Sequence, residues 1–150
     1  MILLPVTLVI AAAAALINIW LAVRVTRGRV SGKIMMGDGG DGPFTAKMRA
    51  HANFAEYAPS ALILLALIEL AGGSPLWLWI AGAVFILARL SHAIGMDRPA
   101  PNPFRAGGAM ITWLVILGLA GWALWIGYTA ESATPQPKIE KPVYLGGAKA

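Results

Sequence analysis

Polar side chains with a regular spacing occur where the sequence changes from polar to apolar. In the segment RAHANFAEYAP, residues 49–59, Arg49, Asn53 and Glu56 follow an i, i+4, i+7 pattern. At about 100° per residue, these positions fall within roughly 60° on one face of a helix, and Ser60 continues that face. His51 would point to the opposite side, at the level of the lipid headgroups. Such a face combines guanidinium, amide and carboxylate groups, which suit an anionic ligand that also has an amino group.

A second group of polar residues has the same design. Arg89 and His92 share a face in the segment ARLSH near the end of another apolar run, and Arg105 follows a proline-bearing loop. A charged residue at the centre of a membrane helix costs about 2.5–3.5 kcal/mol, so each one needs a physical reason. If the two segments meet at one depth, three arginines would surround one carboxylate. We interpret this excess of cations as a binding site for an anionic ligand.

Structural roles are the alternatives to this interpretation. Arg49 alone is typical of an anchor that reaches lipid phosphates at the membrane surface. Glu56 and Arg89 would form an interhelical salt bridge if their role were only to hold the bundle together. Glu69 lies off the polar face near the other end of its helix, and we expect it to serve only the rim or a partner helix. The joint arrangement, rather than any single residue, favours a ligand site.

The elements that must position these residues are membrane spans. The chain is 58% hydrophobic and only 13% charged, whereas soluble domains carry roughly 25% charged residues. A bilayer is crossed by about 20 helical residues, and four apolar stretches are long enough: 3–23, 54–71, 76–94 and 109–128. We therefore predict an all-α integral membrane protein, an antiparallel four-helix bundle over residues 1–128. Residues 129–150 are polar and rich in proline, which predicts a disordered tail.

The distribution of basic residues predicts the orientation. Eight of the twelve Lys and Arg residues lie in the first and third connections, and the short second connection contains none. Because basic loops stay in the cytoplasm, both termini should face away from it. Charge confined to loops also argues against a nucleic-acid partner. The chain has no cysteine, so a thiolate metal site is excluded and any thiol must come from a ligand.

These motifs resemble a known family. RAHANFAEYAP before an apolar helix, ARLSH in the next one and an arginine after a proline-bearing loop are similar to the membrane-associated proteins in eicosanoid and glutathione metabolism, the MAPEG family. GDGG ahead of the motif is similar to its small bacterial branch. The resemblance implies a homotrimer in the bacterial inner membrane with glutathione bound between subunits near the cytoplasmic side. It implies that Arg105 activates the glutathione thiol. The implied glutathione-binding residues are Arg49, Asn53, Glu56, Tyr57, Arg89 and His92, with Arg27 or Arg29 from the first loop.

The activity that the resemblance implies is a membrane-bound glutathione transferase that attacks lipophilic electrophiles from the bilayer, with peroxidase activity as an extension. Met96 stands where several members have tyrosine, and Ala52 and Ala106 differ from the prostaglandin-isomerising branch, so that isomerase activity is not expected. Two alternatives stay open. One is a membrane protein that binds lipid or glutathione without catalysis. The other is a small multidrug exporter, which would need a carboxylate deep in a span, usually the first, where Asn18 is the only polar interruption.

Overall fold

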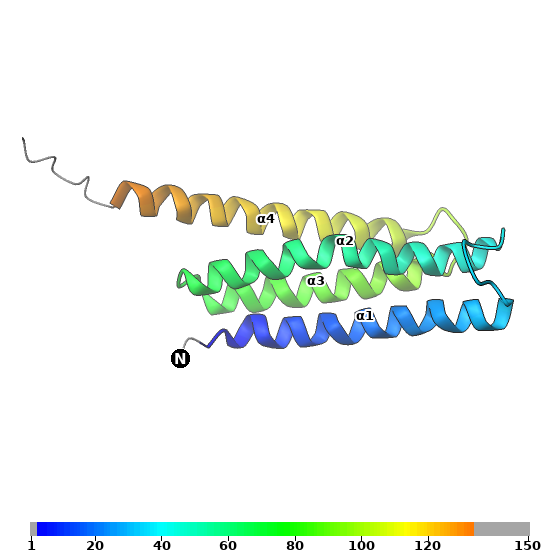
Figure 1. Cartoon of the computed structure of the whole chain (residues 1–150). Helices are drawn as coiled ribbons and strands as arrows, with labels where there is room; N and C mark the ends of the chain where they lie inside the picture. Colours follow the sequence, from blue (N-terminus) through cyan, green and yellow to red (C-terminus); the bar gives the residue numbers. More distant parts are fainter. Residues whose placement is uncertain (1–2, 134–150) are drawn as a thin grey trace, which may run out of the picture.

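The computed structural model describes residues 3–133, and these residues form four antiparallel α-helices without a strand (Figure 1). The helices are α1 (Pro5–Gly32), α2 (Gly42–Leu70), α3 (Pro75–Met96) and α4 (Pro103–Ala133). All four are long and apolar enough to cross a membrane. In Figure 1, α1 and α4 lie on opposite sides of α2 and α3, and the described part of the chain has no contact between α1 and α4. The predicted fold class, an all-α membrane protein with four spans, is confirmed.

The helices extend beyond the apolar runs at the end of the bundle that carries the connections 33–41 and 97–102. These two connections are called the long loops, because the connection at the other end is residues 71–74. α1 continues to Gly32 rather than ending at residue 23, and α2 begins at Gly42 rather than at residue 54. The start of α2 is stabilised by Asp41, whose carboxylate accepts the backbone N–H of Phe44 at 3.2 Å. Hydropathy marks where lipid contact begins, not where a helix begins, because a helix can project into water when its end is capped. The polar motif therefore lies inside a helix and not at its entrance.

The proline-bearing connection before α4 is short, because the helix begins at Pro103, six residues before the apolar run 109–128. Proline is favoured in the first turn of a helix, where its missing N–H would have no partner. The Asn102 side chain acts as the cap, accepting the backbone N–H groups of Phe104 at 2.9 Å and Arg105 at 3.4 Å. Arg105 is consequently held in the first turn of α4.

The end of α4 also differs from the prediction. The tail was expected from residue 129, but the helix continues to Ala133. Residues 129–133 contain neither glycine nor proline, so nothing in this segment interrupts the helical hydrogen bonds. The remainder of the predicted tail, residues 134–150, lies outside the described residues.

Two groups of buried apolar side chains hold the bundle together. Phe54, Phe85 and Leu21 belong to the cluster in the half near the long loops, and Leu65 and Leu78 to the cluster in the other half. Large apolar side chains are exposed along the outer faces of all four helices, as expected for surfaces that contact lipid. α4 is the least buried of the four spans, so most of its surface is free to contact lipid or another subunit.

Glu69 connects the end of α2 to the start of α1. Its two carboxylate oxygens accept the backbone N–H groups of Val6 at 2.9 Å and Thr7 at 2.8 Å. The first N–H groups of a helix have no partner within the helix, and a negative charge there interacts favourably with the helix dipole. We expected Glu69 to serve the rim or a partner helix, and the structure shows that it caps the start of the neighbouring helix α1.

We predict that Glu69→Gln lowers the free energy of unfolding by about 1–2 kcal/mol. The substitution removes the charge and one of two charge-assisted acceptors, leaving one N–H of α1 unsatisfied. Thermal or denaturant unfolding of the detergent-solubilised protein measures the change. Ser74→Ala is the control at the same end of the bundle, because Ser74 makes no side-chain capping bond. Equal stability of Glu69→Gln and the parent protein would contradict the capping role.

Candidate functional site

The centre of the candidate site is Arg89, which is 1% exposed. Its Nη2 donates a hydrogen bond of 2.8 Å to Oδ1 of Asn53, which joins α3 to the polar face of α2. Its Nη1 lies 3.4 Å from the hydroxyl oxygen of Thr112 on α4. Its Nε is buried and has no hydrogen-bond partner among the described residues. A buried guanidinium that is hydrogen-bonded only to neutral groups has a charge that no partner neutralises. Such a charge is available to an anionic ligand.

Aromatic rings complete the surroundings of this guanidinium. Its central carbon lies 5.7 Å from the centre of the Tyr57 ring and 5.9 Å from that of Phe54. Both distances permit cation–π attraction, which partly offsets the cost of burying a charge. Tyr57, which the family resemblance assigns to the glutathione site, therefore lies beside Arg89.

The interhelical salt bridge considered as an alternative is not formed within the described chain. No carboxylate lies within 4.0 Å of Arg89, although Glu56 is near enough to interact with it electrostatically. The Glu56 side chain is exposed at one end of an outer groove of about 500 Å³ between α2 and α4. This outer groove is lined by Glu56, Tyr57, Ser60, Trp113, Ile116, Leu117 and Ala120. It presents a carboxylate and two hydroxyls next to an apolar surface.

Two glycines bring α3 and α4 close together beside Arg89. A methyl group on Gly95 would overlap the backbone of Arg105, and one on Gly108 would lie 2.6 Å from the carbonyl oxygen of Ala88. The close approach places Arg105 beside His92, which interacts electrostatically with both Arg89 and Arg105. His92 is 6% exposed, and its Nδ1 has no hydrogen-bond partner in the described part of the chain.

We predict that Gly108→Ala destabilises the protein by about 1–3 kcal/mol, because its methyl group meets backbone atoms that move only with a whole helix. Gly107→Ala is a matched control, since a methyl group there meets nothing within 4 Å. Unfolding of both variants in the same detergent provides the comparison. Similar free energies of unfolding for the two variants would show that α3 and α4 can move apart to admit the methyl group without loss of stability.

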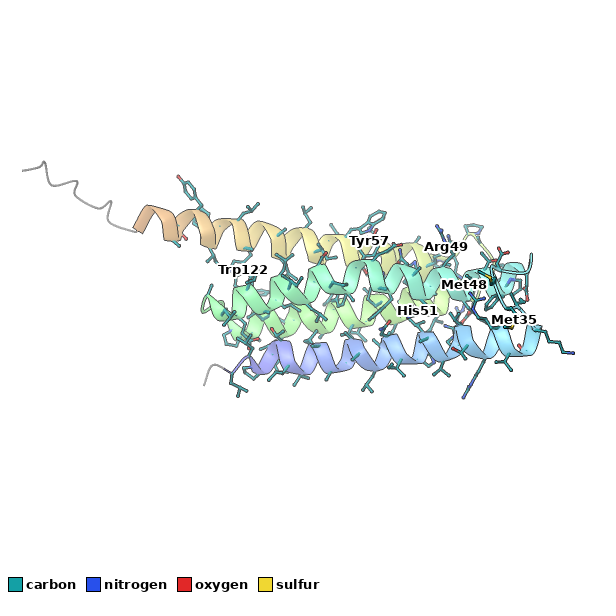
Figure 2. All side chains as sticks on the ribbon, viewed as in Figure 1. Met35, Met48, Arg49, His51, Tyr57 and Trp122 are labelled. Atoms are coloured by element: carbon teal, nitrogen blue, oxygen red, sulfur yellow. The ribbon has the colours of Figure 1, made fainter. Side chains whose placement is uncertain are left out.

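The predicted residues Arg49 and Arg105 do not complete a closed pocket within one chain. Both side chains are exposed, Arg49 on α2 and Arg105 on α4. Figure 2 places Arg49 nearer the long-loop end of α2 than Tyr57. The structure thus brings the buried Arg89 and His92 together with the half-buried Asn53, while Arg49, Glu56 and Arg105 are exposed around them.

The first-loop arginines lie apart from this cluster. Both residues lie in the last two turns of α1, where Arg27 is exposed. Arg29 donates a hydrogen bond of 3.2 Å to the carbonyl oxygen of Gly37 and lies over the ring of Phe44. The same loop is ordered by Asp38, whose pKa is lowered by hydrogen bonds from the Gly40 backbone and from the Thr45 hydroxyl. Because α1 has no contact with α4 in the described residues, these arginines are separated from Arg105 by α2 and α3.

His51 has a partner that the sequence analysis did not identify. Its Nε2 lies 3.0 Å from Oδ1 of Asn18, so the ring is half-buried between α2 and α1 (Figure 2). The prediction that His51 points away from Arg49 and Asn53 is consistent with this contact. The depth of His51 at the level of the lipid headgroups stays a prediction, and Asn18 supplies its ring with a hydrogen-bond partner from within the first apolar run.

Thr112 is the buried polar residue of the cluster that the sequence analysis missed. It is 0% exposed, and its hydroxyl donates to the Gly108 carbonyl oxygen at 2.7 Å. This bond fixes the hydroxyl oxygen toward Arg89. A signal was available, because Thr112 follows Arg105 by seven residues and therefore lies on the same face of α4.

The donor set of the site favours an organic anion over a metal ion. The described residues contain no group of three or more His, Asp or Glu side chains close enough to hold a metal ion. Guanidinium groups bind carboxylates in paired hydrogen bonds, and the nearby Glu56 would bind a cationic amino group. The arrangement can therefore recognise a ligand with both kinds of charge, beside a surface that admits apolar molecules.

Fold and site together define a four-helix membrane protein with a polar, arginine-centred cluster near its long loops. The model of the MAPEG family matches residues 7–125, and the chain belongs to this family. Its relatives include the inner membrane protein YecN of Escherichia coli strain K12, which is 31% identical over 101 residues. That alignment covers 67% of this chain and 76% of the relative, and YecN of Escherichia coli O6:H1 matches to the same extent.

Proposed function

We propose that this protein is a glutathione transferase of the bacterial inner membrane. The observation that carries the proposal is the buried Arg89, which is held by Asn53, has no carboxylate partner within residues 3–133, and interacts electrostatically with the exposed Glu56. An exposed carboxylate in a spanning helix is costly in lipid and needs a partner from outside the chain. Glutathione offers two carboxylates and one amino group, which match this arrangement. Membership of the MAPEG family supports the class of protein, and the similarity to YecN, an inner membrane protein, supports the location.

Each end of glutathione has a candidate partner. Glu56 would bind the amino group of the γ-glutamyl residue, and Arg89 and Arg49 would bind carboxylates. Tyr57 lines the outer groove beside Arg89 and would contact the peptide, and we assign the buried His92 to the same site through its electrostatic interaction with Arg89. The outer groove continues from Glu56 over apolar side chains, and it would receive a lipophilic substrate from the bilayer. The binding residues and the apolar surface are thus adjacent.

A homotrimer would complete the site. Arg27 and Arg29 are on α1, which has no contact with α4 among the described residues, so within one chain they are separated from the α4 side of the site. In an assembly, α1 of a neighbouring copy could cover the open face between α2 and α4 and supply one of these arginines. Burial in such an interface would also remove Glu56 and Arg49 from lipid.

Catalysis would depend on Arg105. The glutathione thiol resembles that of free cysteine, with a pKa of about 8.5. Only a few per cent of free glutathione is therefore thiolate at neutral pH. A guanidinium beside the sulfur in a dry site stabilises the anion and lowers the thiol pKa. The thiolate would attack the electrophilic carbon of a lipophilic substrate and form a thioether as the leaving group departs. Attack on a lipid hydroperoxide would instead consume two glutathione molecules, giving an alcohol, water and glutathione disulfide.

The exporter alternative is less well supported. Asn18, the polar interruption of the first span, is already bound to His51 and contributes to the contact between α1 and α2. The carboxylate of Glu69 caps α1. These contacts give both residues structural roles, which leaves the cluster around Arg89 as the candidate for function.

The ultraviolet spectrum of the thiolate distinguishes catalysis from simple binding. When glutathione is added to the purified protein at neutral pH, we expect a thiolate absorbance to develop in proportion to occupied sites, together with conjugation of a general aryl halide. Binding without thiolate absorbance and without conjugation would favour the non-catalytic alternative.

A further inference from the structure

A second polar pocket lies on the other side of the bundle, and we propose that it binds a phosphate group, either the headgroup of an anionic lipid or a free phosphate ester. The pocket has a volume of about 490 Å³ and is formed where α1, the start of α2 and the end of α3 meet. It is lined by Arg24, Gly42, Pro43, Ala46, Lys47, Met96, Asp97, Arg98 and Pro99. None of the residues assigned to the glutathione site lines it. We refer to it as the basic pocket.

Cations outnumber carboxylates in the basic pocket. Arg24, Lys47 and Arg98 come from or adjoin three different helices, and Asp97 is the one acidic residue that lines the pocket. Asp97 is already engaged, since its Oδ1 accepts a hydrogen bond from Nη2 of Arg24. The charge that remains is positive, and a phosphate diester or monoester would neutralise it.

Arg24 is positioned to donate to such a ligand. Its guanidinium is fixed by Asp97 on one side and lies 4.9 Å from the ring centre of Trp20. Its Nη1 is buried and has no hydrogen-bond partner among the described residues. A guanidinium that is already oriented loses little conformational entropy when it binds a second anion. Arg98 is similarly oriented, 4.5 Å over the ring of Phe104.

The depth of the basic pocket matches that of lipid phosphates. Arg24 follows directly on the apolar run 3–23, Arg98 comes just after the run 76–94, and Lys47 precedes the run 54–71. All three cations therefore lie where apolar sequence ends on the long-loop side, the level at which Lys and Arg reach headgroups. A volume near 490 Å³ lies within the range of about 300–1,000 Å³ found for small-ligand sites.

The test uses the full-length protein in detergent and three probes: short-chain phosphatidylglycerol, short-chain phosphatidylcholine and inorganic phosphate. We expect phosphatidylglycerol to bind more tightly than phosphatidylcholine, and Lys47→Gln to weaken that binding about fivefold, the effect of one cation near an anionic surface. Lys47 has no ion pair within the described chain, so its loss should not disturb the bundle. Lys33→Gln is the matched control, because Lys33 is an exposed lysine at the end of α1 outside the basic pocket.

Arg98→Gln provides a second variant if Lys47→Gln fails to fold, as judged by helical circular dichroism and elution volume. Inorganic phosphate that binds and competes with phosphatidylglycerol would assign the site to phosphate in general. Phosphatidylglycerol binding without phosphate binding would assign it to the lipid headgroup. Equal binding of phosphatidylglycerol and phosphatidylcholine, or equal losses in Lys47→Gln and Lys33→Gln, would overturn the proposal.

Discussion

Replacing Arg89 by methionine should weaken glutathione binding by at least about 100-fold while leaving the bundle about as stable as before. A buried cation that holds an anionic ligand is worth several kcal/mol to binding. Arg89 has no carboxylate partner in the described chain, so an apolar side chain of similar length leaves no unpaired charge behind. The freed amide of Asn53 is half-buried and can reorient toward water. Titration calorimetry and thermal unfolding measure the two effects separately.

Thr112→Val is the matched control for this variant. It removes the weaker of the two Arg89 contacts, at 3.4 Å, and preserves the charge, so we expect less than about a tenfold loss of glutathione affinity. If Arg89→Met unfolds the protein, the guanidinium has a structural role in the bundle. If it folds and binds glutathione normally, the site around Arg89 is not the glutathione site.

Arg105→Ala should lower the rate of conjugation at pH 7 by about 25-fold, the ratio of thiolate fractions for a thiol pKa of about 6.5 and about 8.5, with little change in glutathione affinity. Two units of thiol pKa correspond to about 2.7 kcal/mol, and losing them returns most of the bound thiol to its protonated form. Steady-state kinetics with a general electrophile give the rate, and the thiolate spectrum gives the ionised fraction. We expect the variant to lose both signals together.

Arg105→Lys tests whether charge near the sulfur is sufficient. It should restore part of the thiolate absorbance, because an ammonium group also stabilises the anion but cannot donate a pair of hydrogen bonds in one plane. Full conjugating activity in Arg105→Ala would show that another group activates the thiol.

The sequence predicted the membrane spans and the polar face of α2 because both depend on local patterns. Four apolar runs are long enough for lipid, and the spacing of Arg49, Asn53 and Glu56 places them on one side of any helix that contains them. The helix ends were less predictable, since they depend on capping by Asp41 and Asn102 rather than on hydropathy. Asn102–Pro103 is nevertheless a recognisable helix start, since asparagine is a favoured cap and proline a favoured first residue.

Contacts between helices were beyond what one sequence could specify. The bond between Arg89 and Asn53 depends on how α3 packs against α2, and the approach of Arg105 to His92 depends on Gly95 and Gly108. The pairs Asn18–His51 and Arg24–Asp97 likewise join residues far apart in the chain. Periodicity indicates which face of a helix is polar, but packing alone determines which polar residue on another helix it meets.

Calorimetric titration of the detergent-solubilised protein with glutathione tests the central claim most directly. We predict saturable binding in the micromolar to millimolar range that is lost in Arg89→Met and retained in Arg105→Ala. No detectable heat of binding at millimolar glutathione, with the protein shown to be folded by its helical circular dichroism, would contradict the claim.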